Sequence, residues 1–588
     1  MLNDTRKRVS PFVVGVTGHR DLHPDVLEHL RGAVAGFLKE LGVHLADSEV
    51  RVMAGMASGA DLLVAETALE LGLPVDAVLP MPLAQYAADF DADSFASLKK
   101  LLAHPQVSCI ELPLCAATQQ TATAGVSSRD EHYLALTRVL TRACNLLIAI
   151  WDGESSTLPG GTADTVLRYL GVRTDRTNED TGLLFVDLAS EDDDDLTSRL
   201  VYWIPADRAK TESPPATRAP CFLAGLSDNT LLRLSSMPRR LEVQLRSLNI
   251  YNTEFRRFAY SLRSSGTPDS LMNGLALDSI QPNERAVLDR IDAQYGKADA
   301  LALYFQRRSD QLFAFFNVVA FAMGLAYLAY ERLFESRMLL LAYLFILISS
   351  AGLYFILHER HWFAKHLMCR TLAETLRVKF YLRLASADHL VDAERVLSLS
   401  GVNRFHGFGW IGNVLIPLEL PVAHAEPAGN AQAQDGVTLT WIEEQHRYFV
   451  RKVAMLHSSG IRTKWMKRVL FGGFIVIVMI LLALGDDAGK HFIFGLSLER
   501  AFTFVMGLTA VVLASWELHQ NKMAARELLW QYRNQLKHFS RARSQLARTF
   551  ALSRRLEILG ELGYDSLMES YLWTIHRFHR EHEPPGRA

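Results

Sequence analysis

The sequence has few cysteines and no paired cysteine motif. Its five cysteines are scattered through 588 residues, and no C-x-x-C occurs. This excludes a disulfide framework or a zinc site built on paired cysteines, and it is typical of free thiols in a reducing compartment. The first ten residues are polar and lack the apolar run of a cleavable signal peptide, so we expect a cytoplasmic N-terminal domain.

Charge of one sign is not in excess either. The formal net charge is -2, whereas nucleic-acid binding requires a basic face, so we expect no nucleic-acid partner. No spacing of histidine, cysteine or acidic residues indicates a metal site, and we expect neither a metal nor a cofactor. Three histidines, His358, His361 and His366, are expected at a membrane interface.

Long apolar runs, by contrast, are present. Leu312–Tyr330 and Met338–Leu357 each extend over about 19 or 20 residues without a charge, the length that a helix needs to cross a bilayer. A second pair, Val469–Leu484 and His491–Ser515, repeats the pattern about 160 residues later. The sequence therefore predicts an all-α membrane region with four transmembrane helices, and a lipid bilayer as a partner.

Basic residues flank the pairs of spans, and the turns inside each pair carry fewer cations. The positive-inside rule then predicts an integral protein of the cell (inner) membrane with both termini cytoplasmic. The small residues Gly507, Ala510 and Ala514 lie near one face of the fourth span and favour close helix packing. Because four spans enclose little space, we expect a homo-oligomer, a dimer or tetramer.

After the fourth span, the spacing of apolar residues predicts one long amphipathic helix from Glu517 to about Arg555. Its apolar residues recur at steps of three and four, which is typical of a packing stripe in a bundle. Because the polar face mixes signs of charge, we expect helix packing rather than a role at the membrane surface. Long cytosolic helices are also expected at Glu359–Leu384 and Thr440–Leu456.

The N-terminal region alternates short apolar strands with helices, as in an α/β doubly wound parallel sheet of the Rossmann-like class. Glycine-containing turns follow three segments of this region. The strand Phe12–Thr17 leads into the turn Gly18-His19-Arg20. The strand Val50–Met53 is followed by the turn Gly55 to Asp61. Trp151-Asp152-Gly153 and Pro159-Gly160-Gly161-Thr162 follow the strand Asn145–Ile150. Leu200–Pro205 is expected to be the last strand.

Ligands of such sheets bind at the carboxyl ends of the strands, where glycine lets backbone N–H groups approach a phosphate and a helix N-terminus favours an anion. All three glycine motifs fall at such ends. Together they predict a nucleotide-type site, with Ser58 and Asp61 as polar groups.

The motifs Gly-Val-Thr-Gly-His-Arg, Ser-Gly-Ala-Asp, Trp-Asp-Gly and Pro-Gly-Gly-Thr resemble the SLOG superfamily over about residues 10–205. That superfamily includes LOG-type nucleotide hydrolases, DprA-like proteins and the N-terminal domains of melastatin-type TRP channels. The resemblance implies sensing of a nucleotide-derived signal, often ADP-ribose-like, in anti-phage defence. The paired spans with long cytosolic helices resemble SLATT effector domains, which accompany SLOG domains in predicted pore-forming systems.

By position, the resemblance implies three groups of ligand-binding residues and no catalytic residue. The first group lines one side of the pocket and comprises Gly15, Thr17, Gly18, His19 and Arg20. The second side comprises Gly55, Ser58, Gly59, Ala60 and Asp61, with Glu66 in the helix behind; Asp152 and Gly153, after the strand Asn145–Ile150, are also assigned to the ligand. The phosphate is assigned to Gly160, Gly161, Thr162 and Thr165.

Enzymatic LOG proteins continue this last motif as Pro-Gly-Gly-x-Gly-Thr-x-x-Glu, whereas this chain has Ala163 and no glutamate in Asp164–Leu170. We therefore expect binding without turnover, and a membrane effector or pore gated by a nucleotide-derived second messenger, ADP-ribose-like or a cyclic nucleotide. Two alternatives stay open: a membrane-anchored nucleotide or NAD hydrolase, and a structural membrane anchor. The expected domains are residues 10–205 (nucleotide-signal binding), 206–310 (linker and helical connector), 311–357 (first hairpin), 358–467 (cytosolic helices with a loop insertion), 468–516 (second hairpin) and 517–588 (C-terminal helices).

Overall fold

The computed structural model divides the chain into two compact units. Unit 1 comprises Met1–Lys297 and Thr375–Asn430, and unit 2 comprises Ala298–Glu374 and Ala431–Ala588. The structure describes residues 9–114, 128–156, 158–172, 183–187, 199–209, 218–227, 230–264, 270–273, 275, 282–334, 336–358, 360–402, 407–420, 435–485, 488, 492–493 and 496–582. The loop predicted at Ala423–Asp435 lies almost entirely outside these residues.

The core of unit 1 is a sheet with nine strands in the described residues, in the order β4-β3-β2-β1-β5-β7-β8-β9-β6. The first six of these in sheet order are parallel to one another, as predicted. Their residues are β1 Phe12–Gly18, β2 Val50–Ala54, β3 Val75–Leu79, β4 Val107–Glu111, β5 Leu146–Trp151 and β7 Val201–Pro205. The central strands are buried on both faces, which explains why they are continuous apolar runs rather than alternating ones.

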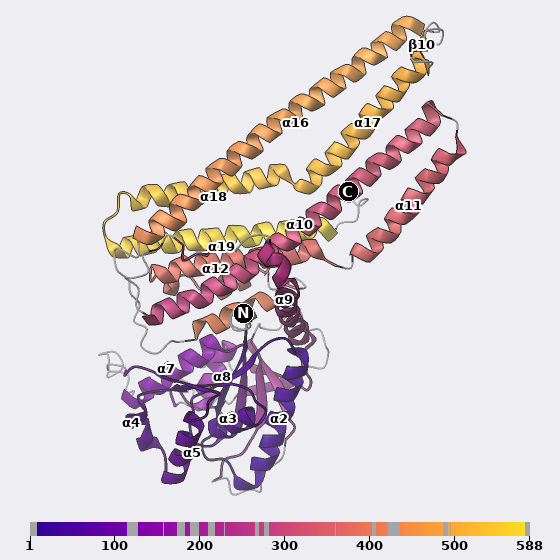
Figure 1. The fold of residues 1–588 in the computed structure, drawn as a ribbon. Helices are drawn as coiled ribbons and strands as arrows, with labels where there is room; N and C mark the ends of the chain where they lie inside the picture. The colour runs from indigo at the N-terminus through magenta and orange to yellow at the C-terminus, as the bar shows by residue number, and fades with distance from the viewer. Residues whose placement is uncertain are drawn as a thin grey trace. The chain divides into compact units, whose positions relative to one another are not determined.

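Helices connect the parallel strands and lie against the sheet (Figure 1). Pro24 begins a short 3-10 turn, Pro24–Val26, that leads into the first long helix. Asp91 caps α5 by accepting a hydrogen bond from the Ser94 N–H at 2.8 Å, and Gly171 ends α8 with φ 72°. The helices are α2 Leu27–His44, α3 Ala60–Glu70, α4 Leu83–Tyr86, α5 Ala92–Leu102, α7 Ser128–Ala143 and α8 Thr162–Leu170, with a 3-10 turn at Ala87–Asp89.

The prediction that Leu200–Pro205 is the last strand was wrong. β8 (Cys221–Ser227) pairs antiparallel with β7, and β9 (Thr230–Leu234) pairs antiparallel with β8. β6 (Leu184–Asp187) pairs parallel with β9 at the outer edge. The sheet is therefore mixed, and residues expected to be linker extend it, because their apolar side chains cover the core beside β7.

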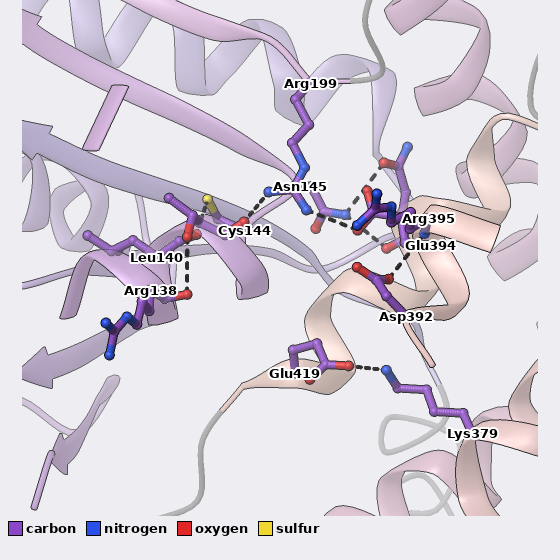
Figure 2. A network of polar contacts seen from close by, with 12 residues as sticks. Arg138, Leu140, Cys144, Asn145, Arg199, Lys379, Asp392, Glu394, Arg395 and Glu419 are labelled. Carbon is purple, nitrogen blue, oxygen red and sulfur yellow. Dashed lines mark hydrogen bonds and ion pairs between the residues drawn. The ribbon is translucent and has the colours of Figure 1, made fainter. Parts of the chain in front are cut away.

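The segment that follows α12 (Trp362–Leu384) packs against the sheet of unit 1, although it lies between the two hairpins in sequence. Asn145, just before β5, accepts the Val13 N–H of β1 at 2.8 Å and donates to the Asn413 carbonyl at 3.0 Å. Arg199 pairs with Glu394 at 3.0 Å (Figure 2). The helical pieces here are Asp388–Leu390, α13 Ala393–Leu399, α14 Trp410–Leu415 and Ile416–Glu419, and α9 Arg239–Ser264 also belongs to this unit.

Unit 2 contains the membrane region. In the described part of the chain, four helices are long and apolar enough to cross a membrane. They lie within α10 Pro282–Arg332, α11 Arg337–His358, α16 Glu443–Leu484 and α17 Leu498–Met523. The fourth helix begins later than predicted, because Phe492–Ile493 and Leu496–Ser497 form a small antiparallel β-ribbon, β10 and β11. A π-helical turn, Thr438–Ile442, precedes α16.

The two hairpins pack on each other through α10 and α17. A methyl group at Gly507 would lie 2.4 Å from Cδ1 of Leu328, and one at Gly324 would lie 2.9 Å from Val511. Nearby, the Ser515 hydroxyl donates to the side-chain oxygen of Asn317 at 2.8 Å. The predicted close packing at Gly507 is thus confirmed, and a polar contact joins the same two helices.

The long helix predicted from Glu517 to Arg555 is broken twice, which corrects that prediction. Ala524 takes φ 47° and separates α17 from α18 (Ala525–Leu546), and α19 (Leu552–His582) starts after a second break. His361 takes φ 49° at the corresponding point after α11. No glycine or proline lies at Ala524 or at the break before α19, so the sequence pattern does not indicate these breaks.

Candidate functional site

The candidate site lies where the direction of strand addition reverses. β2 and β5 flank β1 on opposite sides, so the carboxyl ends of β1 and β5 form the switch point at which open α/β sheets bind ligands. The glycine turns after β1, β2 and β5 all end at this edge. Thr17 and Gly18 close β1, whereas Gly15 lies inside the strand and packs against Cys144.

The turns after β1 and β2 are in direct contact. The Ala60 N–H donates to the His19 carbonyl at 3.0 Å. Gly59 has φ 80°, and a methyl group there would lie 2.5 Å from the carbonyl oxygens of both His19 and Arg20. A glycine is therefore required at position 59 both for its backbone conformation and for space.

The turns after β1 and β5 are joined by His19 and Asp152. Nε2 of the buried His19 lies 3.0 Å from a carboxylate oxygen of Asp152 and accepts the Asp152 backbone N–H at 3.1 Å. Arg208 pairs with the same carboxylate at 3.2 Å. Burial raises the pKa of Asp152, but the contact with His19 and the hydrogen bonds from the Glu154 N–H and Arg208 outweigh it and lower the pKa to about 2. Asp152 is therefore a fixed negative charge that holds the two turns together.

The Pro159–Thr165 segment is placed by α7. Gly160 has φ 73°, and a methyl group there would lie 2.7 Å from the backbone of Tyr133. The Gly160 N–H donates to the Asp164 carboxylate at 2.9 Å, and the Thr165 hydroxyl contacts that of Thr137 at 2.9 Å. These groups are thus engaged within the protein.

Thr162, in contrast, is half-buried at the start of α8, whereas the N–H of the preceding Gly161 already donates to the Leu158 carbonyl at 3.1 Å. The first backbone N–H groups of a helix have no partner within the helix and point out of its N-terminus. This end of α8 therefore offers donors at the carboxyl edge of the sheet.

A polar cluster that the sequence did not reveal completes the site. The guanidinium of the exposed Arg20 lies 5.0 Å from the ring centre of Tyr133. The Tyr133 hydroxyl donates to Asp89, which also pairs with Arg129. The Tyr86 hydroxyl donates to the Gly55 carbonyl at 3.1 Å. These side chains belong to α4, the turn after it and α7, and no motif in the sequence marks them.

Asp61 carries the other notable carboxylate of the site. It is 7% exposed and accepts the Ala57 N–H at 3.2 Å. Burial raises its pKa to about 7, although the Ala57 N–H, the positive charge of Arg20 and the Gly55 N–H act in the opposite direction. This group therefore changes charge near neutral pH. Ser58, in the same turn, is half-buried.

Glu66 points elsewhere. Its carboxylate pairs with Arg31 of α2 at 2.6 Å, so it joins two helices rather than the glycine turns. Gly153, the residue after Asp152, has φ 90°, and a methyl group there would lie 3.1 Å from Trp203. Within the described residues, no group of three histidine, cysteine or acidic side chains has the arrangement of a metal site.

Comparison with models of protein families gives no match for this chain, and none of the curated protein sequences matches it. The geometry of the site therefore carries the functional inference.

Proposed function

We propose that this protein is a membrane receptor for a phosphate-bearing, nucleotide-type ligand that binds at the carboxyl edge of the parallel sheet. The observation that carries this proposal is the convergence of the glycine turns on His19 and Arg20. His19 contacts the turns after β2 and β5, and Arg20 lies over Tyr133, against whose backbone Gly160 packs.

The exposed and half-buried groups at this edge suit a phosphate. Arg20 supplies a cation, and the start of α8 at Thr162 supplies backbone donors and the positive end of a helix. Asp61 reduces anion binding when it is ionised, because its charge opposes that of Arg20. Ligand affinity is then highest below the pKa of Asp61, where the carboxyl is neutral.

The membrane helices are the output of the proposed receptor. Ligand binding favours one arrangement of unit 1, and helices α10 and α16, which run into the spans, pass the change on. A ligand shifts this equilibrium only by its difference in affinity for the two states. The gated pore, the homo-oligomer, the inner-membrane location with cytoplasmic termini and the role in anti-phage defence remain expectations from charge and resemblance.

A hydrolase is the second candidate, and Asp61 is the observation that favours it. A carboxylate with a pKa near 7 is suited to act as a general base at neutral pH. Glu66 is a weaker candidate for this role, because its carboxylate pairs with Arg31.

Calorimetric titration separates the two candidates. The full-length protein in detergent would be titrated with ADP-ribose, NAD and a set of cyclic dinucleotides, and each compound recovered and analysed afterwards. We expect one compound to bind and to be recovered intact, and the variant Arg20→Gln to bind it at least about tenfold more weakly, since a hydrogen bond to a charged group is lost. A cleaved product whose formation requires Asp61 would instead support the hydrolase. Equal binding by wild type and Arg20→Gln would contradict a site at this edge.

A further inference from the structure

One face of α18 carries cations and a tryptophan in a single line. Arg526, Trp530, Arg533, Lys537 and Arg541 are all exposed and follow one another at steps of four, three, four and four residues. At about 100° per residue these positions fall within a stripe about 80° wide, and the stripe extends over about 22 Å. We call these five residues the cationic stripe.

The cationic stripe contains no acid. The one acidic residue of α18, Glu527, lies about 100° around the helix from Arg526. Among the described residues, the four cations of the stripe form no ion pair. Arg543, which lies off the stripe, does pair, with Glu443 of α16 at 2.5 Å. The polar residues of α18 as a whole carry both signs of charge. The cationic stripe carries only positive charge, because Arg543 and Glu527 lie off it.

The opposite face of α18 is already occupied within unit 2. Phe539 is buried and its ring centre lies 5.6 Å from that of Phe449 and 5.7 Å from that of Trp441. His538 lies 3.0 Å from Asp565 of α19. Phe539 and Leu546 of the packing stripe predicted from apolar spacing are thus buried on the inner face, whereas Phe550, beyond the end of α18, is 90% exposed. The cationic stripe is what α18 presents outward.

The position of the stripe in the chain identifies its partner. α18 begins two residues after the end of α17, the fourth candidate span, and the left-handed Ala524 turns it away from the direction of α17 (Figure 1). A cluster of four or more Lys and Arg residues directly next to a span is attracted to anionic lipid head groups. Trp530, 66% exposed, is the residue type that favours the boundary between acyl chains and head groups.

We propose that the cationic stripe of α18 binds the head groups of anionic phospholipids at the surface of the membrane that α17 crosses. The four charges reach toward the phosphates while Trp530 inserts among the head groups. The neighbouring span holds the stripe at this surface, so no separate recruitment is required. This proposal does not depend on the ligand of unit 1.

Lipid-dependent thermal unfolding of the full-length protein in detergent tests the proposal. The probes are dioctanoyl-phosphatidylglycerol, which is anionic, and dioctanoyl-phosphatidylcholine, which is zwitterionic. The stripe variant replaces its four cations by glutamine: R526Q, R533Q, K537Q and R541Q. A control variant removes four exposed cations of unit 1: K39Q, K99Q, K100Q and R239Q. A charge-preserving variant keeps the stripe positive: R526K, R533K and R541K.

A lipid that binds the folded state raises the unfolding midpoint. We expect the anionic lipid to stabilise wild type, the control and the charge-preserving variant selectively. The stripe variant should unfold at the wild-type midpoint without lipid and should need at least about 100-fold more anionic lipid for the same shift, at the strength typical of a surface charge near lipid.

Three results would overturn the proposal. The first is an equal lipid response in the stripe and control variants. The second is stabilisation of wild type by a short DNA duplex but not by the anionic lipid, which would make the stripe a nucleic-acid contact. The third is a loss of oligomer mass in the stripe variant with an unchanged lipid response, which would make it a contact between subunits.

Discussion

The buried carboxyl of Asp61 makes a quantitative prediction about stability and pH. Its pKa is about 7 in the folded protein against an ordinary value of 3.8, so the folded state binds a proton more tightly than the unfolded state. The two pKa values differ by about three, which at about 1.4 kcal/mol per tenfold difference corresponds to about 4 kcal/mol. The stabilising contribution of the neutral carboxyl is complete below about pH 4, decreases as the pH rises toward 7, and is absent above that.

The substitution Asp61→Asn isolates this effect. Asparagine keeps an oxygen for the Ala57 N–H but carries no charge at any pH. We expect the variant to be more stable than wild type at pH 8, by up to about 4 kcal/mol, and this difference to fall to about 2 kcal/mol at pH 5. Thermal unfolding of the full-length protein, followed by tryptophan fluorescence between pH 5 and 8, measures the difference. Parallel pH profiles for the two proteins would refute the reasoning, because they would show that Asp61 does not titrate in this range.

Three further predictions concern the glycine turns, the joint between them and the membrane helices. Gly59→Ala should lower the free energy of unfolding by about 3 kcal/mol or more, because the added methyl group meets backbone oxygens. The control Gly72→Ala, also at positive φ but in open space, should lower it by about 1 kcal/mol in the same denaturant titration. Asp152→Asn should remove about 2 kcal/mol of stability at pH 7. This deficit should shrink as acid protonates the wild-type carboxylate from pH 4 toward its pKa of about 2. A deficit that does not change with pH would show that the charge of Asp152 does not stabilise the fold. Gly507→Val should lower the unfolding midpoint in detergent through overpacking between α10 and α17, whereas Gly472→Val, at an open position of α16, should not.

The sequence predicted the parallel core and the spans because both are recorded in runs of apolar residues. β1 and β5 are buried on both faces, and each span is a nearly uncharged helix, so composition alone specifies them. β8 and β9 were missed because they follow a Pro-rich stretch typical of a linker, and their strand character depends on pairing with β7.

The candidate site was predictable in its glycines and less so in its side chains. Gly59 and Gly160 are required by backbone conformation and space, which leaves a mark in the sequence. Tyr133 and Asp89 reach the site only through the placement of α7 and of the turn after α4, and no local pattern records that placement. The pKa of Asp61 likewise follows from burial, which the sequence does not show.

Ion flux through reconstituted liposomes tests the central claim most directly, because it measures ligand binding and membrane response together. Wild type and Arg20→Gln would be reconstituted at equal density and challenged with ADP-ribose, NAD and the cyclic dinucleotides. We predict that at least one compound opens wild-type liposomes and that Arg20→Gln requires a higher concentration of it. A compound that binds the protein tightly without changing the flux would contradict the account and leave the membrane helices as an anchor.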